Sequence, residues 1–263
     1  MNKGMLAMQR YFVSGSQWCE ENVHITGEDA HHITRVMRFN VGDHIICNHP
    51  GGSVAECEID SLSHDSVIAT IIHWKEESAE LPVDVTIIQA LPKGDKIEFT
   101  MQKGTELGAC EFIPFTADRS IVKWDDKKKD KKQRRFLKIV KEASEQCHRN
   151  KIPDVQPVMS LEDAIKFVEG YDVKLFAHTD EARTDDFQSL AHSLKQTFHN
   201  HRIVICVGPE GGFSEQEVAL LKKQDFSPVR MGPRILRTET AALYALASIS
   251  YHFEELRWNL CQQ

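Results

Sequence analysis

The chain lacks the features that mark membrane, secreted and metal-binding proteins. No apolar run in its 263 residues approaches the roughly 20 residues that a membrane helix needs. Residues 1–10 lack the apolar stretch of a signal peptide, so we expect a cytoplasmic protein. The seven cysteines are scattered without a Cys-x-x-Cys pair, and the thirteen histidines form no His-x-x-x-His or Cys/His cluster. We therefore expect free thiols and no metal site.

Two common phosphate-binding signatures are also missing, although glycine-rich segments are present. Residues 203–215 contain Gly-Pro-Glu-Gly-Gly, which does not have the G-x-G-x-x-G spacing of dinucleotide-binding proteins. No Gly-Lys-Ser/Thr follows, so the segment is not the phosphate loop of a nucleotide hydrolase. A dehydrogenase and a P-loop enzyme are both excluded as interpretations of these loops.

The net charge of −7 argues weakly against a nucleic-acid partner, but its distribution argues for one. Ten Lys/Arg stand against three Asp between residues 123 and 141. The ten cations are Lys123, Lys127, Lys128, Lys129, Lys131, Lys132, Arg134, Arg135, Lys138 and Lys141. Two interpretations stay open for this stretch: a solvated helix face, or a patch that contacts nucleic-acid phosphates.

The first 74 residues have the pattern of a small β-rich domain. Short apolar strand runs surround one helical segment, residues 28–38, and His49-Pro-Gly-Gly is a hairpin turn. The expected strands begin at Arg10 and Val23 and cover 41–48, 53–60 and 66–74. Several short strands with one helix favour a small barrel. The polar stretch 75–82, which ends in proline, is the expected linker.

Beyond this linker, in the predicted domain 75–263, strand runs alternate with helical runs. The expected strands are 83–91, 111–115, 173–177 and 202–207. The expected helices are 96–107, 127–149, 161–168 and 188–197, and Gly108 is suited to end the first of them. This alternation predicts an α/β domain with a parallel sheet covered by helices. No internal repeat is evident.

Two strand–loop–helix units follow each other near the C-terminus, at 203–215 and 231–242. Gly208, Gly211 and Gly212 allow a sharp turn and a close approach to a ligand. Ser214 and Glu217 form a capping box, so a helix begins there, and Thr238 can cap the next helix. We expect the two units to be adjacent and their loops to meet at the sheet edge where α/β proteins bind ligands. For the first loop alone, a tight turn before a capped helix is an equally good interpretation.

The second loop carries charges that are costly unless they are paired or used. Arg234, Arg237 and Glu239 all follow the end of a predicted strand. The small residues Ala241 and Ala242 at the helix start permit close packing against another segment or subunit. This combination favours a functional loop.

The amino-acid sequence of these two loops resembles that of the ribosomal RNA small subunit methyltransferase E family, of the SPOUT class. The resemblance rests on Val207-Gly-Pro-Glu-Gly-Gly-Phe-Ser and on Met231-Gly-Pro-Arg-Ile-Leu-Arg-Thr-Glu-Thr-Ala. It extends over most of the chain through His31-His-Ile-Thr-Arg-Val-Met-Arg, Val41-Gly-Asp, Leu91-Pro-Lys-Gly-Asp-Lys, Gln102-Lys-Gly-Thr-Glu-Leu-Gly and Glu142-Ala-Ser-Glu-Gln with Arg149.

The resemblance implies an N-terminal PUA-like β-barrel for RNA and a C-terminal SPOUT domain that contains a trefoil knot. It implies a homodimer with S-adenosylmethionine bound beside the subunit interface. The implied reaction methylates N3 of one uridine of 16S rRNA, in the decoding region of the small (30S) ribosomal subunit.

On this basis the site residues can be named as expectations. The residues expected to bind the cofactor are Leu175, Phe176, Ala177, Gly208, Pro209, Glu210, Gly211, Gly212, Met231, Gly232, Ile235, Leu236 and Thr238. Arg237 is expected to stabilise the uracil anion. Glu239 or Glu210 would accept the N3 proton, although we favour Glu239 as the residue that holds Arg237 in position.

The cations expected to contact RNA phosphates are Arg10, Arg35, Arg38, Lys93, Lys96, Lys127, Lys128 and Arg134. Arg35 and Arg38 could instead form the polar face of a short helix. Two other functions stay open: a non-catalytic RNA-binding or ribosome-assembly protein with this fold, and a SPOUT methyltransferase that acts on tRNA or 23S rRNA.

Overall fold

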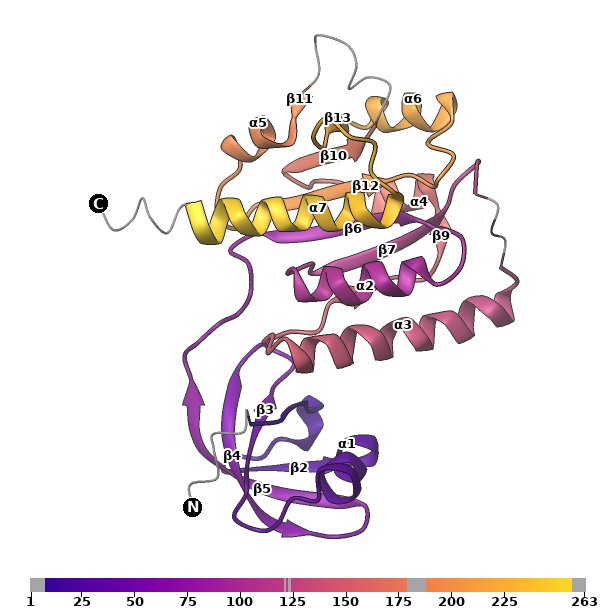
Figure 1. Ribbon diagram of the computed structural model, residues 1–263. Coiled ribbons are helices and arrows are strands. Elements are labelled where there is room, and N and C mark those ends of the chain that lie inside the picture. Colours follow the sequence, from indigo (N-terminus) through magenta and orange to yellow (C-terminus); the bar gives the residue numbers. More distant parts are fainter. Residues whose placement is uncertain (1–7, 121, 123, 179–187, 257–263) are drawn as a thin grey trace. The chain divides into compact units, whose positions relative to one another are not determined.

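The computed structural model describes residues 8–120, 122, 124–178 and 188–256. The chain forms two compact units, residues 1–80 with 144–151 and residues 81–143 with 152–263 (Figure 1). The eight-residue segment 144–151 therefore packs with the N-terminal residues, although about sixty residues separate it from them in the chain. Lys123, the first cation of the basic stretch, lies outside the described residues.

The first unit is a curled five-stranded sheet with short helical turns, in agreement with the expected β-rich domain. Its strands are β1 (Arg10–Phe12), β2 (Asn22–Thr26), β3 (His44–Asn48), β4 (Val54–Leu62) and β5 (Ser66–Lys75), in the order β1-β3-β4-β5-β2. Its helical turns are η1 (Gly15–Gln17), α1 (Gly27–His31) and η2 (His32–Met37). Alternate strand residues such as Ile45 and Cys47 point into one core, which Ile33 of η2 closes.

The hairpin turn predicted at His49-Pro-Gly-Gly is confirmed between β3 and β4. The His49 amide donates to the Ser53 carbonyl at 2.8 Å, and the Gly52 amide donates to the His49 carbonyl at 2.9 Å. Gly52 has φ +92°, a conformation that glycine adopts without strain. The turn therefore fixes the register in which His44 faces Glu58 and Asn48 faces Val54.

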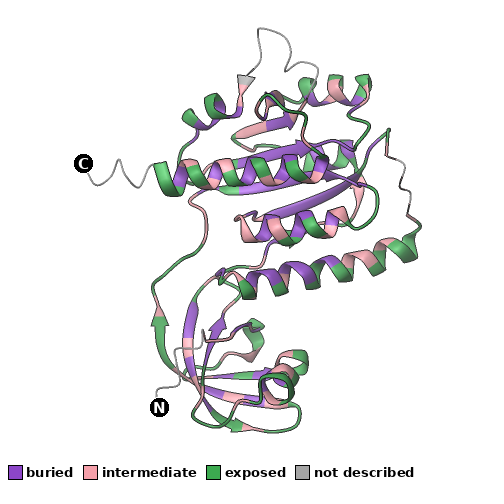
Figure 2. Ribbon diagram, in the orientation of Figure 1, coloured by how far each residue is buried: buried purple, intermediate pink, exposed green. Residues whose placement is uncertain are grey.

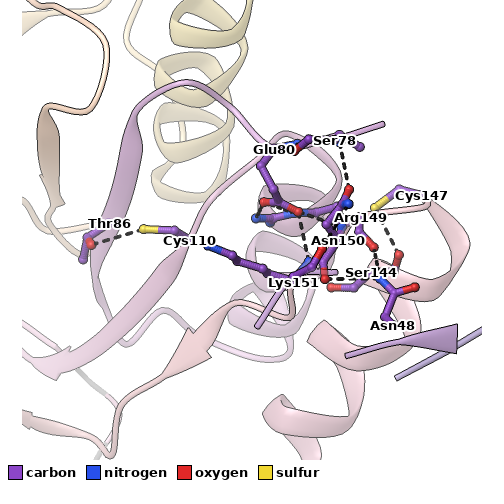
Figure 3. A network of polar contacts seen from close by, with 12 residues as sticks. Asn48, Ser78, Glu80, Thr86, Cys110, Ser144, Cys147, Arg149, Asn150 and Lys151 are labelled. Atoms are coloured by element: carbon purple, nitrogen blue, oxygen red, sulfur yellow. Dashed lines mark hydrogen bonds and ion pairs between the residues drawn. The ribbon is translucent and has the colours of Figure 1, made fainter. Parts of the chain in front are cut away.

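A network of polar contacts ties residues 149–151 to the rest of the first unit (Figure 3). The Glu80 carboxylate forms an ion pair with the Arg149 guanidinium and accepts hydrogen bonds from the amides of Asn150 and Lys151 at 2.8 and 3.1 Å. Asn48 Nδ2 donates to the Arg149 carbonyl at 2.8 Å, so this network also reaches β3. These contacts explain why a segment so distant in the chain belongs to this unit.

The second unit is a parallel sheet with helices on both faces, which confirms the predicted α/β class. Its strands are β6 (Asp84–Ala90), β7 (Glu111–Thr116), β8 (Asp154–Val155), β9 (Met159–Ser160), β10 (Val173–Ala177), β11 (Gln188–Ser189), β12 (Arg202–Val207) and β13 (Ser227–Arg230). Their order is β11-β13-β10-β12-β6-β7-β8, and β9 pairs with β7. The helices are α2 (Lys96–Glu106), α3 (Asp126–Gln146), α4 (Leu161–Phe167), α5 (Leu190–Lys195), α6 (Glu215–Lys223), α7 (Thr238–Ser250) and η4 (Tyr251–Leu256).

Two apolar cores, one on each face of the sheet, hold this unit together. In β12, Ile203 and Ile205 pack with α2, α3, α5 and α7, whereas Val204 and Cys206 pack with α4 and α6. Because both faces are covered, the central strands β6, β7 and β12 are rich in apolar residues and are buried over most of their length (Figure 2). This burial holds the loops at the strand ends on a rigid support.

Most expected element boundaries agree with the structure to within a few residues, and one segment differs. Helix α2 ends before Gly108, whose φ of +91° ends the helix as expected. The segment 188–197, expected to be helical throughout, begins instead with the short strand β11, which pairs with β13. Its helix starts only at Leu190, after Ser189 caps it by accepting from the His192 amide.

Candidate functional site

The carboxyl ends of four neighbouring strands meet at one edge of the sheet. The strand register aligns Ala177 of β10 with Val207 of β12 and with Val229 of β13, and it aligns Val207 with Gln89 of β6. The loops after these strands carry the residues expected to bind a cofactor. The two glycine-containing units are consecutive in the chain but not adjacent in the sheet, because β10 lies between β12 and β13. The third expected segment, Leu175–Ala177, therefore occupies the middle of this edge.

The loop after β12 is a closed turn that the glycines make possible. The Gly212 amide donates to the Pro209 carbonyl at 2.9 Å, and Gly212 has φ +70°. A Cβ atom on Gly208 would lie 3.1 Å from the Phe213 ring, so a side chain there would push that ring aside. The predicted capping box is confirmed, because Ser214 accepts from the Glu217 amide and Glu217 accepts from the Ser214 amide. Helix α6 therefore begins at the expected residue.

Thr238 has a different role from the predicted helix cap. The residue before it, Arg237, occupies the capping position of α7 without a side-chain cap. Thr238 is buried, and its hydroxyl donates to the Gly208 carbonyl at 2.7 Å and accepts from Gln89 Nε2 at 2.8 Å. The hydroxyl points to the strand ends instead of back along its own helix, so it joins three elements of the site.

A charged cluster lies beside this bridge, and Lys96 is at its centre. Lys96 Nζ is 2.9 Å from Glu210 Oε1 and 3.6 Å from Glu239 Oε2. Glu210 Oε1 also accepts from the Lys93 amide at 3.3 Å. Burial would raise the pKa of Glu210, but the hydrogen bonds from Lys96 and from backbone amides, together with the charge of Lys96, outweigh it, so the pKa lies below its usual value. The hydrogen bond between Lys96 and Glu210 raises the pKa of Lys96.

Arg237 is exposed, and among the described residues it forms no ion pair with Glu239. The pairing that we favoured for Glu239 is therefore absent from this structure, and Glu239 faces Lys96 instead. The Arg237 guanidinium is left available to a ligand.

Sequence reasoning missed two residues of this edge. Gln89 lies inside a buried strand, and a polar residue within an otherwise apolar run is a signal that could have revealed it. Arg119, in the loop after β7, donates from Nη1 to the Gly211 carbonyl at 3.2 Å. Its Cβ would be 3.3 Å from a Cβ added to Gly211, so Arg119 packs closely on the glycine loop.

The residues expected to contact RNA phosphates fall into two groups. Six are exposed: Arg35, Arg38, Lys93, Lys127, Lys128 and Arg134. Two are engaged within the chain. Arg10 is buried and donates to Asn48 Oδ1 and to the Arg149 carbonyl, both at 3.3 Å, so the phosphate contact expected for it is not supported. Lys96 is engaged with the two glutamates.

In the described part of the chain, no helix is long and apolar enough to cross a membrane. The described His, Cys, Asp and Glu residues form no group that could hold a metal ion.

Comparison with known proteins identifies the family. Residues 79–250 match the model of an RNA methyltransferase domain, and residues 25–72 match that of an RNA methyltransferase PUA domain. The ribosomal RNA small subunit methyltransferase E of Bacillus subtilis is 47% identical over 95% of this chain and 99% of the relative. The chain belongs to the ribosomal RNA small subunit methyltransferase E family.

Other members of the methyltransferase E family support this assignment. The Synechocystis enzyme is 33% identical over 92% of this chain and 77% of its own. The structure of the Neisseria gonorrhoeae enzyme bound to S-adenosylmethionine matches with a TM-score of 0.81 at 29% identity, over 93% of this chain and 97% of that one. The resemblance noted in the sequence is thereby confirmed, together with the α/β class of the second unit and the PUA-like class of the first.

The residues of this edge fit the cofactor that the family uses. Gln89 Oε1 is a buried acceptor without a hydrogen-bond partner among the described residues. S-adenosylmethionine carries donors that could satisfy such an acceptor, namely an adenine amino group, ribose hydroxyls and an ammonium group. Leu175 and Phe176 are almost fully buried, so their side chains belong to the two cores of the sheet.

Proposed function

We propose that this chain transfers a methyl group from S-adenosylmethionine to N3 of one uridine of 16S rRNA, in the decoding region of the small ribosomal subunit. The observation that carries the proposal is the gathering of both glycine-containing loops, Arg237 and two glutamates at one sheet edge in a chain of this family. As an enzyme of the ribosome it would work in the cytoplasm.

The cofactor would be held mainly by backbone groups. We assign this role to the three strand-end segments, 175–177, 208–212 and 231–236, with Thr238 holding two of them together. The closed turn at Gly212 and the exposed backbone of Gly211 and Gly212 suit close contact with a ligand. Bound there, S-adenosylmethionine supplies an electrophilic methyl group on a sulfonium.

Methylation at N3 requires the protein to accept one proton and to stabilise one negative charge on the uracil. The N3–H bond of uracil breaks, an N3–CH₃ bond forms, and the CH₃–S bond breaks with its electron pair left on sulfur. The proton passes to a carboxylate of the protein, and Glu239 and Glu210 are the candidates at this edge. The exposed Arg237 would stabilise the uracil anion through the carbonyls beside N3.

For RNA binding, we assign the six exposed cations Arg35, Arg38, Lys93, Lys127, Lys128 and Arg134 to the rRNA backbone. The uridine must leave its base stack to reach the site, as in other enzymes that modify bases.

We also propose a homodimer. Exposed apolar side chains on and beside α7 and η4 support it: Ile235 is 73% exposed, Tyr244 39% and Tyr251 56%. Burial of such side chains against a second copy would be favourable. Light scattering of the purified protein tests this, and a mass equal to one chain would contradict it.

Mass spectrometry of 16S rRNA from a strain that lacks this protein tests the function. We expect one N3-methyluridine to disappear and to return when the gene is restored. Loss of a methylated residue from tRNA or 23S rRNA would instead indicate the other SPOUT activity. Unchanged RNA, with no heat from S-adenosylmethionine in calorimetry, would indicate a non-catalytic binding protein.

A further inference from the structure

Lys96 connects segments that are far apart in the chain. It is the first residue of α2, whereas Glu210 follows β12 and Glu239 is the second residue of α7. Its ammonium lies within 4 Å of both carboxylates, at 2.9 and 3.6 Å. The charged groups that face it from these elements are Glu210, Glu239 and, at longer range, Arg237. One lysine therefore offsets the charge of both candidate proton acceptors.

The two glutamates depend on Lys96 in different ways. Glu210 accepts a hydrogen bond from Lys96 and a second one from the Lys93 amide, and its side chain is 36% exposed. Glu239 is only 16% exposed, and its Oε2 is buried without a hydrogen-bond partner among the described residues. At 3.6 Å, Lys96 lies too far from that oxygen for a hydrogen bond, but its charge stabilises the carboxylate. The Glu239 carboxylate thus faces the Lys96 ammonium within 4 Å.

Resting on the proposed function, we propose that Lys96 is a positioning residue which holds Glu239 as the ionised acceptor of the uridine N3 proton. Glu210 acts with the Lys93 amide to fix the Lys96 ammonium in place. The N3–H bond breaks as its proton passes to the Glu239 carboxylate, and the electron pair left on N3 forms the bond to the methyl group. Lys96 itself contacts neither reactant, which differs from the phosphate contact expected from the sequence.

Kinetics of the full-length enzyme, with S-adenosylmethionine and 30S subunits from a strain that lacks it, test this assignment. We expect Lys96→Met to lower kcat about tenfold on the acid limb of the pH–kcat profile and little at neutral pH, because the Glu239 carboxylate without its cation binds a proton more readily. The acid limb of the pH–kcat profile should move up by about one pH unit, and KM for the 30S subunit should change less than about twofold.

Three further variants sharpen the test. Lys96→Arg keeps a cation and should restore most of kcat and the normal acid limb. Glu239→Gln should lose activity at every pH, since it removes the acceptor. Lys103→Met removes a lysine of the same helix that pairs only locally with Glu106, at 2.7 Å, and should behave as the wild type.

A stability measurement, which does not depend on catalysis, distinguishes the loss of the Lys96 contacts from general damage to the fold. Glu210 has a lowered pKa, so its pairing stabilises the fold above the usual carboxyl pKa and that stability is lost as the pH falls through the folded value. Thermal unfolding of Lys96→Met should therefore depend less on pH between about 3 and 6 than that of the wild type.

Two results would overturn the assignment. If Lys96→Met raises KM and weakens the salt dependence of 30S binding while the pH profile stays fixed, Lys96 is a phosphate contact. If Glu239→Gln retains the acid limb, Glu239 is not the acceptor. A wild-type enzyme that forms no N3-methyluridine would instead contradict the proposed function, and this is known before any variant is made.

Discussion

Two carboxylates at opposite ends of the same sheet are held in different ways. At the carboxyl edge, Glu210 is paired with the Lys96 ammonium and is partly exposed. Near the amino ends of β6 and β7, Glu111 is 8% exposed and accepts hydrogen bonds from three neutral groups: Gln156 Nε2 at 2.7 Å, Thr86 Oγ1 at 3.2 Å and the Tyr171 hydroxyl at 3.4 Å. Burial raises the pKa of Glu111, whereas hydrogen bonding to a cation lowers that of Glu210.

The two carboxylates are of different kinds. Glu210 has a cation partner and stays charged, whereas Glu111 is a buried carboxyl group that neutral donors satisfy. A cation partner keeps Glu210 ionised at the edge where a ligand would bind. The neutral donors around Glu111 satisfy its oxygens but do not offset its charge. The first unit adds a third case, since Glu80 is paired with the Arg149 guanidinium, whose side chain is only 4% exposed. A cation partner in a buried site therefore serves stability, and the following experiments test this distinction.

The largest effect should come from Arg149→Met, which leaves the Glu80 carboxylate without its cation. We expect the free energy of unfolding to fall by about 3 kcal/mol, because a buried charge loses its partner. Urea denaturation measures it. Lys151→Met is the matched control, since the Lys151 amide still donates to Glu80 while its exposed side chain is truncated. Equal stabilities of the two variants would mean that the ion pair contributes nothing.

In contrast to Arg149→Met, Arg237→Ala should greatly lower the rate of methylation and change the free energy of unfolding little. We expect kcat to fall about a hundredfold, as when one donor to a developing anion is removed. Methyl incorporation into 30S subunits measures it, with the exposed Lys223→Ala as the control variant. Near-normal turnover would exclude Arg237 from anion stabilisation.

A smaller effect is expected from Glu111→Gln. Because the folded pKa of Glu111 is raised, its contribution to stability is greatest below the unfolded pKa and is lost as pH rises through the folded value. Between about pH 4 and pH 8 the wild type should lose stability that the variant keeps. Denaturation at both pH values measures this, with the exposed Glu169→Gln as control. An unchanged pH dependence would show that the neutral donors suffice.

The smallest effect concerns RNA binding and the charges of the two units. The first unit contains seven Lys/Arg and thirteen Asp/Glu, whereas the second contains twenty-five Lys/Arg and twenty-six Asp/Glu. The second unit is therefore the less acidic of the two. We expect substitution of Lys127, Lys128 and Arg134 by Ala to weaken 30S binding severalfold and to reduce its salt dependence. Binding assays at several salt concentrations measure this. The exposed Lys166, Lys195 and Lys223 form the control set, and an equal loss in both sets would contradict a specific patch.

Local signals in the sequence predicted local structure well. The Ser214–Glu217 capping box, the turn at 49–52 and the helix end at Gly108 all depend on a few consecutive residues, and all agree with the structure. The alternation of strands and helices predicted a parallel sheet with ligand-binding loops at one edge, but not the strand order, which places β10 between the two units expected to be adjacent.

Partners distant in the chain could not be predicted in the same way. Nothing near Thr238 indicates that its hydroxyl meets the Gly208 carbonyl, thirty residues away. Lys96 reads as an exposed cation until Glu210 and Glu239 are brought beside it. From the sequence alone Arg10 is also interpreted as an exposed cation, whereas in the structure it donates to Asn48 and to the Arg149 carbonyl. In each case a side chain suited to several partners takes the one that the fold supplies.

The position of β10 between β12 and β13 determines the stage of synthesis at which the site can be completed. A chain emerging from the ribosome contains β6, β10 and β12 well before residues 227–250 appear. Until β13 pairs with β10 and Thr238 reaches Gly208, the edge has neither its last strand nor Arg237 and Glu239. The proposed catalytic residues are thus the last part of the site to be added, and a chain that ends before the Arg237 cap of α7 would form most of the sheet without Arg237 and Glu239.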